Sequence, residues 1–457
     1  MNERDFAALS FEGAPSILVA PPGPGSRELL EFQREHEGSA VSYPRGLPMA
    51  VQRARGATVE DVDGNLYIDF FGGAGVMAVG HGNPEVTEAA IAQLRQLTHA
   101  LDLPNPARRS LVERLLSVLP SELGRLFFGG PTGSDAVELA IKIAKFNTRR
   151  QSVVAFEGSY HGMTAGALSL SSGRSFKAGL GALLPDVHFA PYPYCYRCAF
   201  GRTREDCSLE CAGYLDRMLD DPHSGVSEPA AVIVEPIQGE GGSIVPPLQF
   251  MARVREACDR HGAVLVADEI QAGFCRTGKM FAFEHSGVVP DVVTMSKALG
   301  GIGLPISGIA YREKFNTMPP GLHIGTFRGN VAAYAAGAAA IDFMVTRDLA
   351  GHAASVGRDM LSALAPVHAE SEIVGDVRGA GLMLGVEFVT DRATKEPAPG
   401  LASAVRTACH RRGVLFEIGG HYSNVARFLP PLVITRELAL RGVDVFAEAV
   451  REVERSR

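Results

Sequence analysis

Short apolar runs alternate with longer helix-like stretches through the middle of the chain, from about residue 126 to residue 311. Strands that are apolar throughout are buried on both faces, and the stretches between them supply the crossovers that parallel strands require. We therefore expect an α/β fold with a mostly parallel central sheet covered by helices. The expected strands are 152–156, 231–234, 263–267, 292–295 and 306–311, with helices at 136–147 and 251–261.

The pattern changes after Phe343, where a helix at 349–364 is followed by short strands and a last helix. We expect three parts: residues 1–75 as an N-terminal arm and a segment packing with the small domain, 76–342 as the large cofactor-binding domain, and 343–457 as a small α+β domain. The turn-rich stretch 21–25, PPGPG, predicts no regular element.

Composition narrows the class of partner. The 457 residues are 46% hydrophobic and 21% charged with a net charge of -7, which argues against a nucleic-acid or polybasic membrane surface. The longest apolar run, 331–341, is too short to span a bilayer, so we expect a buried helix and no membrane partner. The N-terminus lacks the apolar stretch of a secretory signal, and the seven cysteines do not suggest a disulfide framework. We expect a cytoplasmic protein.

A lysine follows the run at 292–295 closely, at Lys297 in the segment TMSKALGG. Burial disfavours the charged form of an amine, so a lysine at the end of a buried strand has a lowered pKa and can attack an aldehyde. A solvated loop lysine is the competing interpretation. The other motifs bear on this choice.

Residues suited to a planar nitrogen heterocycle follow two expected strands. Asp268 ends the run AVLVAD, and a carboxylate at the carboxyl edge of a parallel sheet faces the ligand crevice of open α/β folds. It could keep a pyridine nitrogen protonated, while Gln271, on the same side of the turn, suits a ring hydroxyl. In FEGSYHGMT, Tyr160 could stack on such a ring, and we expect the adjacent His161 to contact the cofactor as well. Helix capping by Asp268 and core packing by Tyr160 are the alternatives.

A glycine-rich turn, GGPTGSDAVELAIKIAK at 129–145, leads into an expected helix. Gly133 and Ser134 would present N–H groups and a hydroxyl at the positive end of this helix, which is a site for a phosphate. Simple capping by Thr132 or Ser134 is the alternative.

Several of these motifs, in this order, resemble those of the class III aminotransferases, a family of fold-type-I pyridoxal-phosphate enzymes. The resemblance covers nearly the whole chain. It implies an α/β fold-type-I transferase, with a mostly parallel central sheet in the large domain and a smaller α+β C-terminal domain. The matching segments are DVDGNLYIDFFGGAGVMAVGHGNPEV, VIVEPIQGEGG, VADEIQAGFCRTGK, TMSKALGG and RFLPPLVIT.

The resemblance also implies roles for individual residues in binding pyridoxal phosphate. Lys297 matches the family's Schiff-base lysine and Asp268 its pyridinium partner. Tyr160 matches the ring-stacking aromatic residue, and Gly133 with Ser134 matches the phosphate-binding pair.

Three further matches concern the partner subunit and the substrate. The family takes a phosphate contact from the neighbouring subunit, and Thr326 in GTFRGN matches it, which implies a homodimer with shared active sites. Arg427 matches the arginine that binds the carboxylate of glutamate or 2-oxoglutarate. Glu240 matches the acidic residue that pairs with this arginine when an amine lacking that carboxylate is bound. A purely structural Arg427–Glu240 bridge is the alternative.

Some segments are most similar to the diaminobutyrate aminotransferase branch, among them SKALGGIGLPIS and GLHIGTFRGN. The resemblance implies amino transfer between glutamate or 2-oxoglutarate and a terminal aldehyde or amine, of the diaminobutyrate type or from secondary metabolism, such as an amino sugar. Cys275 replaces a usual glycine and Ala272 a common threonine of the family. We expect Val76, Met77 and the neighbouring glycines to shape the pocket, which allows an acceptor larger than a simple amino acid. A racemase or epimerase of the same family is the alternative. A scaffold without turnover fits poorly, because Lys297, Asp268 and the phosphate turn are all present.

Four cysteines crowd into one segment, at Cys195, Cys198, Cys207 and Cys211. Their spacing, Cys-x2-Cys-x8-Cys-x3-Cys, is short enough for one tetrahedral zinc site. Free thiols are the alternative, so structural zinc is a hypothesis beside the expected pyridoxal phosphate.

Overall fold

The computed structural model describes residues 3–457, and the apolar runs form one seven-stranded sheet in it. The strand order is β4-β10-β9-β8-β7-β5-β6, and only β10 runs antiparallel to its neighbours. The expectation of a mostly parallel sheet is confirmed. Its strands are β4 (Arg125–Phe128), β5 (Val153–Phe156), β6 (Val187–Ala190), β7 (Ala231–Val234), β8 (Val264–Asp268), β9 (Val292–Met295) and β10 (Gly308–Tyr311).

Helices cover both faces of this large sheet, which is why its central strands are largely apolar. Val154, Val232 and Leu265 pack with α10 (Glu210–Asp220) and α11 (Gln249–His261) on one face. Their neighbours Val153, Ile233 and Val264 pack with α7 (Gly133–Thr148) on the other. Adjacent residues of a strand point to opposite faces, so each strand contributes to two cores.

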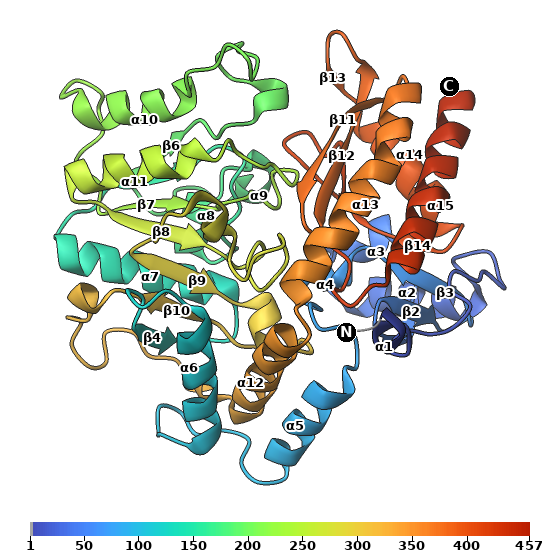
Figure 1. Ribbon diagram of the computed structural model, residues 1–457, viewed down its shortest axis with the longest axis horizontal. Coiled ribbons are helices and arrows are strands. Elements are labelled where there is room, and N and C mark those ends of the chain that lie inside the picture. The colour runs from blue at the N-terminus through green and yellow to red at the C-terminus, as the bar shows by residue number, and fades with distance from the viewer. Residues whose placement is uncertain (1–2) are drawn as a thin grey trace.

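The C-terminal part of the chain builds a smaller antiparallel sheet of order β11-β12-β16-β15, with β13 paired to β12. Figure 1 shows it beside the large sheet, in orange and red. Its elements are α13 (Leu349–Glu370), β11 (Val374–Ala380), β12 (Met383–Asp391), β13 (Glu396–Pro397), α14 (Pro399–His410), β15 (Glu417–Gly419), β16 (Val425–Phe428) and α15 (Arg436–Arg455).

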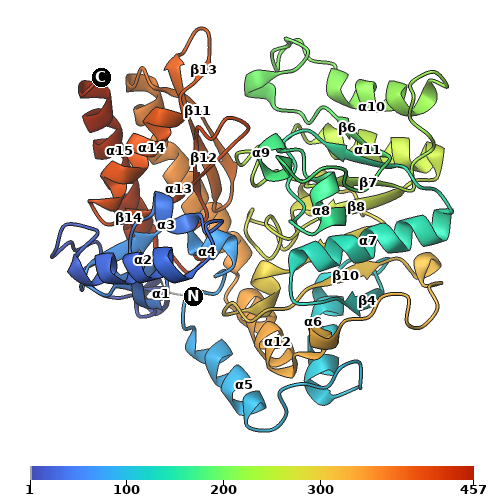
Figure 2. The ribbon, with the colours of Figure 1, turned by 180° about the vertical axis from the view of Figure 1, so that it is seen from behind.

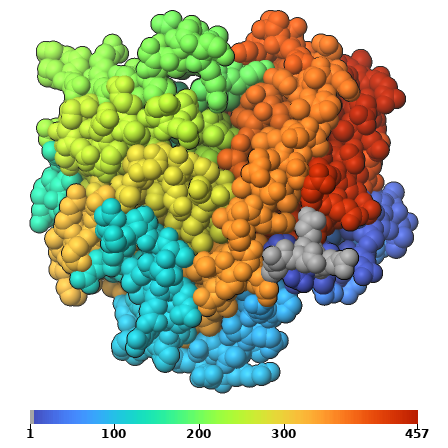
Figure 3. All heavy atoms as spheres, viewed as in Figure 1, coloured from blue at the N-terminus to red at the C-terminus, as the bar shows by residue number. Residues whose placement is uncertain are grey.

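The N-terminal strands lie with this C-terminal part. β1 (Val51–Arg55), β2 (Thr58–Asp61) and β3 (Leu66–Asp69) form a sheet that β14 (Val414–Leu415) completes by pairing in parallel with β3. Figures 1 and 2, from opposite sides, both show the blue N-terminal elements against the red C-terminal ones. In the space-filling view of Figure 3, the orange segments pack along the yellow and green ones.

One local expectation is wrong. The stretch 21–25 was expected to hold no regular element, yet α2 (Pro24–His36) begins inside it. Pro24 occupies the first turn of the helix. An N–H group at this position would have no acceptor within the helix, so proline loses no hydrogen bond, and its fixed φ is already helical. The N–H groups of Gly25 and Ser26 donate to the Asp63 carboxylate at 2.7 and 2.9 Å, which completes the helix start.

The apolar run 331–341 lies in α12 (Val331–Thr346) and is largely buried, as expected. Among the described residues, no helix is both long and apolar enough to cross a membrane. The remaining elements are α1 (Glu3–Ala7), α3 (Tyr43–Gly46), α4 (Gly72–Gly75), α5 (Pro84–Leu94), α6 (Pro106–Val118), α8 (Ala165–Leu170), α9 (Arg174–Lys177), η1 (Cys195–Arg197), η2 (Ala282–Ser286), η3 (Lys297–Gly300), η4 (Glu313–Phe315) and η5 (Thr326–Gly329).

Candidate active site

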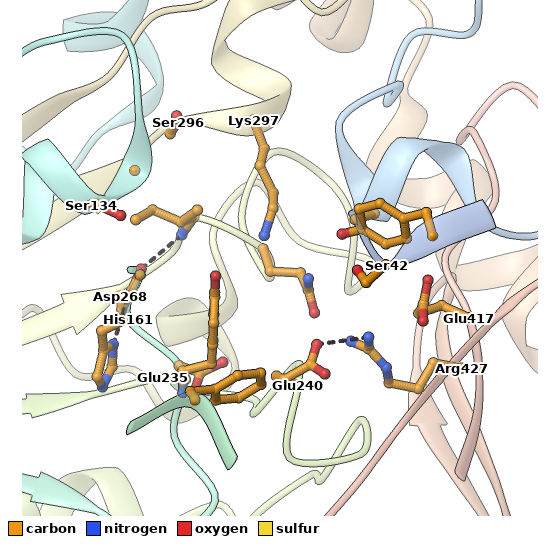
Figure 4. Close-up of a pocket in the computed structure, with 18 residues that line it drawn as sticks. Ser42, Ser134, His161, Glu235, Glu240, Asp268, Ser296, Lys297, Glu417 and Arg427 are labelled. Carbon is orange, nitrogen blue, oxygen red and sulfur yellow. Dashed lines mark hydrogen bonds and ion pairs between the residues drawn. The ribbon is translucent and has the colours of Figure 1, made fainter. Parts of the chain in front are cut away.

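A cavity of about 440 Å³ lies where the carboxyl ends of the large sheet's strands meet the small sheet. This edge is where open α/β folds place their ligands. Figure 4 shows charged side chains from both sheets pointing into it. Of the ten residues expected to bind cofactor or substrate, nine line it: Gly133, Ser134, Tyr160, His161, Glu240, Asp268, Gln271, Lys297 and Arg427.

Asp268 is held rigidly at the end of β8. Its Oδ2 lies 2.6 Å from His161 Nδ1, and its Oδ1 accepts the Thr294 hydroxyl at 2.8 Å and the Ile270 N–H at 3.1 Å. The carboxylate is only 3% exposed, so these partners replace water. Asp268 therefore presents a fixed, buried acceptor to the cavity, with its orientation set by neighbours on three segments.

Lys297 follows β9 and begins the turn η3, with its side chain pointing into the cavity (Figure 4). Burial lowers the pKa of Lys297, and Asp268 opposes this shift. Its backbone has φ +46°, a left-handed conformation that residues other than glycine adopt at a cost of about 1–3 kcal/mol. A lowered pKa leaves more of the amine neutral and nucleophilic, as the sequence predicts.

The turn before α7 offers an anion site at the amino end of a 16-residue helix. Thr132 makes no capping bond with its side chain, and the Ser134 hydroxyl accepts the Met163 N–H at 3.1 Å instead of capping α7. Gly162 lies against Ser134 so closely that a Cβ there would overlap the hydroxyl. The capping alternative is therefore not what the structure shows.

Two buried polar atoms at the cavity lack a hydrogen-bond partner among the described residues: His161 Nε2 and Gln271 Oε1. Buried polar groups are nearly always paired, so unpaired ones beside a cavity indicate a ligand or bound water. A Cβ at Gly239 would collide with Gln271 Oε1, so glycine at 239 leaves this amide its place. His161 is 2% exposed.

Arg427 of β16 faces these groups from the small sheet. Its Nη2 lies 2.7 Å from Glu240 Oε2, and its side chain is 3% exposed. Its Nε and Nη1 are buried without a partner among residues 3–457. A guanidinium with two unpaired N–H groups can donate to a substrate carboxylate while it stays paired with Glu240.

Five charged or polar residues of the cavity were not expected from the sequence: Ser42, Tyr43, Glu235, Ser296 and Glu417. Burial raises the pKa of Glu235 to about 7, although it accepts the N–H groups of Tyr160 and Gly239 at 3.1 and 2.8 Å. Glu235 directly follows β7, so the signal that identified Asp268 could also have found it. Glu417 and Tyr43 belong to segments far from the large sheet in the sequence and carried no such signal.

Thr326 is the one expected cofactor residue that lies outside the cavity of this chain. It begins η5 and is exposed, and its carbonyl lies 2.5 Å from His99 Nε2. The neighbouring Phe327 is 71% exposed. Its proposed role on a second subunit stays a prediction.

The zinc hypothesis finds no support. No group of three or more His, Cys, Asp or Glu side chains within residues 3–457 is arranged to hold a metal ion. Cys195 Sγ donates to the Pro193 carbonyl and Cys207 Sγ to Glu210, while burial raises the pKa of Cys211 to about 12. Close spacing in sequence does not fix where each Sγ points, and Cys195, Cys198, Cys207 and Cys211 are all free thiols.

Comparison with known proteins agrees with the site. Residues 40–450 match the family model of class-III aminotransferases. The chain is 41% identical over 433 residues to the diaminobutyrate–2-oxoglutarate aminotransferase of Haemophilus influenzae, covering 93% of this chain and 95% of that protein. It is 38% identical to a leucine/methionine racemase of Thermococcus litoralis, covering 92% and 94%. An amine transaminase from an uncultivated Pseudomonas species, solved with pyridoxal phosphate bound, superimposes with a TM-score of 0.83 at 30% identity, covering 92% and 98%.

Proposed function

Because the chain belongs to the class III aminotransferases, we propose that it transfers the terminal amine of 2,4-diaminobutyrate to 2-oxoglutarate, using pyridoxal phosphate. The observation that carries this proposal is the position of Arg427 and Glu240 in the same cavity as Lys297. Two substrates must use one site in turn. A carboxylate-binding arginine with an internal counter-charge suits both an α-keto dicarboxylate and an amine.

The residues present fit pyridoxal phosphate. The amino end of α7, with Gly133 and Ser134, would hold its phosphate, and the unpaired His161 Nε2 and Gln271 Oε1 offer polar contacts that the protein itself leaves unused. When bound, the cofactor supplies an aldehyde for amine exchange and a ring that withdraws electrons. Asp268 would keep the ring nitrogen protonated, because it is a buried carboxylate with a fixed orientation.

Lys297 would carry the proton transfer. Burial lowers the pKa of Lys297, so its Nζ can take the proton from the substrate carbon that bears the reacting amine. The same Nζ would then deliver this proton to a carbon of the cofactor. The Lys297 side chain points into the cavity that Arg427 closes from the other sheet (Figure 4). A substrate held by its carboxylate at Arg427 therefore extends toward Lys297.

We infer that the protein acts as a homodimer in which Thr326 of one subunit serves the phosphate site of the other. The segment around Thr326 and the segment around Ala100 lie together, since the Ala100 N–H donates to the Gly329 carbonyl at 3.0 Å. Both segments expose apolar side chains, which an interface would cover. These side chains are Leu94, Leu97, Leu101, Leu103, Leu322, Ile324 and Phe327.

The direct test is the reaction itself. Protein loaded with pyridoxal phosphate should form glutamate from 2,4-diaminobutyrate and 2-oxoglutarate, with one glutamate for each diaminobutyrate consumed. Glutamate formation is measured with a coupled dehydrogenase. The same assay with 4-aminobutyrate and with an amino sugar ranks the donors. A donor outside the diamino acids that is used at least tenfold better would contradict the substrate assignment.

Racemisation is the second candidate, because one relative is a leucine/methionine racemase. It requires no keto acid, so chiral chromatography after incubation with single amino acids separates the two functions. Interconversion of enantiomers in the absence of 2-oxoglutarate would favour the racemase. We expect the enantiomeric purity of leucine and methionine to stay unchanged.

A further inference from the structure

Glu417 occupies a part of the cavity wall whose role is not explained by the cofactor or by the Arg427–Glu240 pair. It lies on β15, directly opposite Arg427 of β16 in the antiparallel register. Cross-strand partners of this kind point to the same face of a sheet, so the carboxylate and the guanidinium both face the cavity. Figure 4 shows the two side chains next to each other.

The Glu417 carboxylate is left without a counter-ion. It makes no salt bridge among residues 3–457, because Arg427 is directed at Glu240 and Arg406 lies beyond salt-bridge distance. Burial raises the pKa of Glu417, Arg427 opposes the shift and Glu240 adds to it. A cation brought beside this carboxylate would lower the cost of its charge.

We propose that Glu417 binds the α-ammonium group of the amino donor, so that Glu417 and Arg427 together recognise a zwitterionic α-amino acid head. The inference deepens the proposed function and rests on it. Arg427 Nε and Nη1 are free to take the α-carboxylate, while Nη2 remains with Glu240. The far end of the substrate, with its reacting amine, then faces Lys297 (Figure 4).

This arrangement separates two otherwise matched amines. 2,4-Diaminobutyrate and 4-aminobutyrate have the same chain length, the same carboxylate and the same terminal amine, and differ only in the α-ammonium group. The first satisfies both Arg427 and Glu417. 4-Aminobutyrate satisfies Arg427 alone. It leaves the Glu417 carboxylate unpaired and close to the carboxylate of 4-aminobutyrate, and this like-charge contact is unfavourable for binding.

The test compares the binding of these two compounds to the wild type and to Glu417→Gln. Calorimetry is done on holoenzyme in the pyridoxamine form, which binds amines without turnover. The loss of one charge-assisted contact should weaken 2,4-diaminobutyrate at least about tenfold in Glu417→Gln. 4-Aminobutyrate should bind at least as tightly as it does to the wild type. Glu417→Asp, which keeps the charge, should recover part of the lost affinity.

Glu240→Gln is the matched control, since it removes the other carboxylate beside Arg427. It should change the affinities for both compounds by a similar factor, because it acts through Arg427. Equal weakening of the two compounds in Glu417→Gln, or no change in either, would overturn the proposal. If the wild type forms no glutamate from 2,4-diaminobutyrate, the proposed function fails, while the ratio of the two affinities still decides the role of Glu417.

Discussion

His161 Nδ1 lies 2.6 Å from Asp268 Oδ2, inside a wall where both side chains are almost fully buried. Asp268 Oδ1 is meanwhile occupied by Thr294 and by the Ile270 N–H. The carboxylate that faces the proposed cofactor ring is thus oriented by groups from three segments of the chain. Because His161 Nδ1 contacts this carboxylate, we predict that His161 positions Asp268, while its unpaired Nε2 stays available to the cofactor.

Asp268→Asn should reduce kcat about 100- to 1,000-fold, because the amide cannot keep a ring nitrogen protonated. His161→Asn leaves the negative charge of Asp268 in place but holds this carboxylate less firmly, so we expect a smaller reduction of kcat, about tenfold. Single-turnover kinetics with glutamate measures both. The visible spectrum of the bound cofactor gives the second readout, since a purely structural defect would lower occupancy without moving the absorption maximum. Equal losses in the two variants would contradict the order of roles.

Lys297→Ala should abolish turnover, with a loss of at least about 1,000-fold, since Lys297 is the residue proposed to bond the cofactor and to move the proton. The visible absorbance of the purified holoenzyme should disappear as well. Lys279 is an exposed lysine in the loop that follows β8, so Lys279→Ala is the matched control. This variant should keep both the turnover and the visible absorbance. An unchanged visible spectrum in Lys297→Ala would falsify the assignment.

Arg427→Ala should raise the KM for 2-oxoglutarate about 100-fold, because a bidentate carboxylate contact is lost and Glu240 is left unpaired in the cavity. An apolar amine without a carboxylate tests the specificity of the effect, and its kcat/KM should change less than threefold. A parallel loss for both substrates would indicate that the Arg427–Glu240 bridge is structural.

Glu235 gives the folding stability a pH dependence with a definite sign. Burial raises its folded pKa from 4.5 to about 7, so the folded state binds this proton more tightly than the unfolded chain does. Its contribution to stability is complete below pH 4.5 and is lost as the pH rises to about 7. Glu235→Gln removes this titration. Between pH 5 and pH 7.5 the wild type should therefore lose about 2–3 kcal/mol more free energy of unfolding than the variant, as denaturant titration can measure.

The sequence predicts the large sheet well because its signal is local. Continuous apolar runs mark β7, β8 and β9 within one residue of their bounds, and polar residues after them mark the site. Asp268, Lys297 and the α7 turn are found in this way, and Glu235 obeys the same rule.

Other parts of the site depend on contacts between distant segments. Glu417 reaches the cavity because β15 pairs with β16, and Tyr43 lies on α3, which packs against α14. No local pattern specifies either contact. The cysteine spacing suggested a zinc site that the described residues do not form, and the reason is related. A spacing limits the length of chain between thiols, while their direction is set by packing, as with the buried Cys211 on α10.

A buried charge network ties the cysteine segment to the small sheet. Glu387 of β12 has a fully buried side chain, and it accepts Arg197 Nε at 2.6 Å, Arg378 Nη1 at 2.8 Å and the Tyr194 hydroxyl. Removing the charge leaves the largely buried Arg197 without its carboxylate and leaves Arg378 with Asp376 alone. Breaking a buried pair in this way costs about 3–5 kcal/mol.

Glu387→Gln should therefore lower the free energy of unfolding by about 3 kcal/mol in denaturant titration. The opening should start locally, because Tyr194 is adjacent to Cys195 in the sequence and Arg197 is adjacent to Cys198. A thiol reagent should label these two cysteines faster in the variant under native conditions, before global unfolding exposes the buried Cys258. Glu113→Gln breaks the exposed Arg109–Glu113 pair and should change the stability by less than about 0.5 kcal/mol. Uniformly faster labelling of all cysteines would show instead that Glu387 supports the whole fold and not this segment.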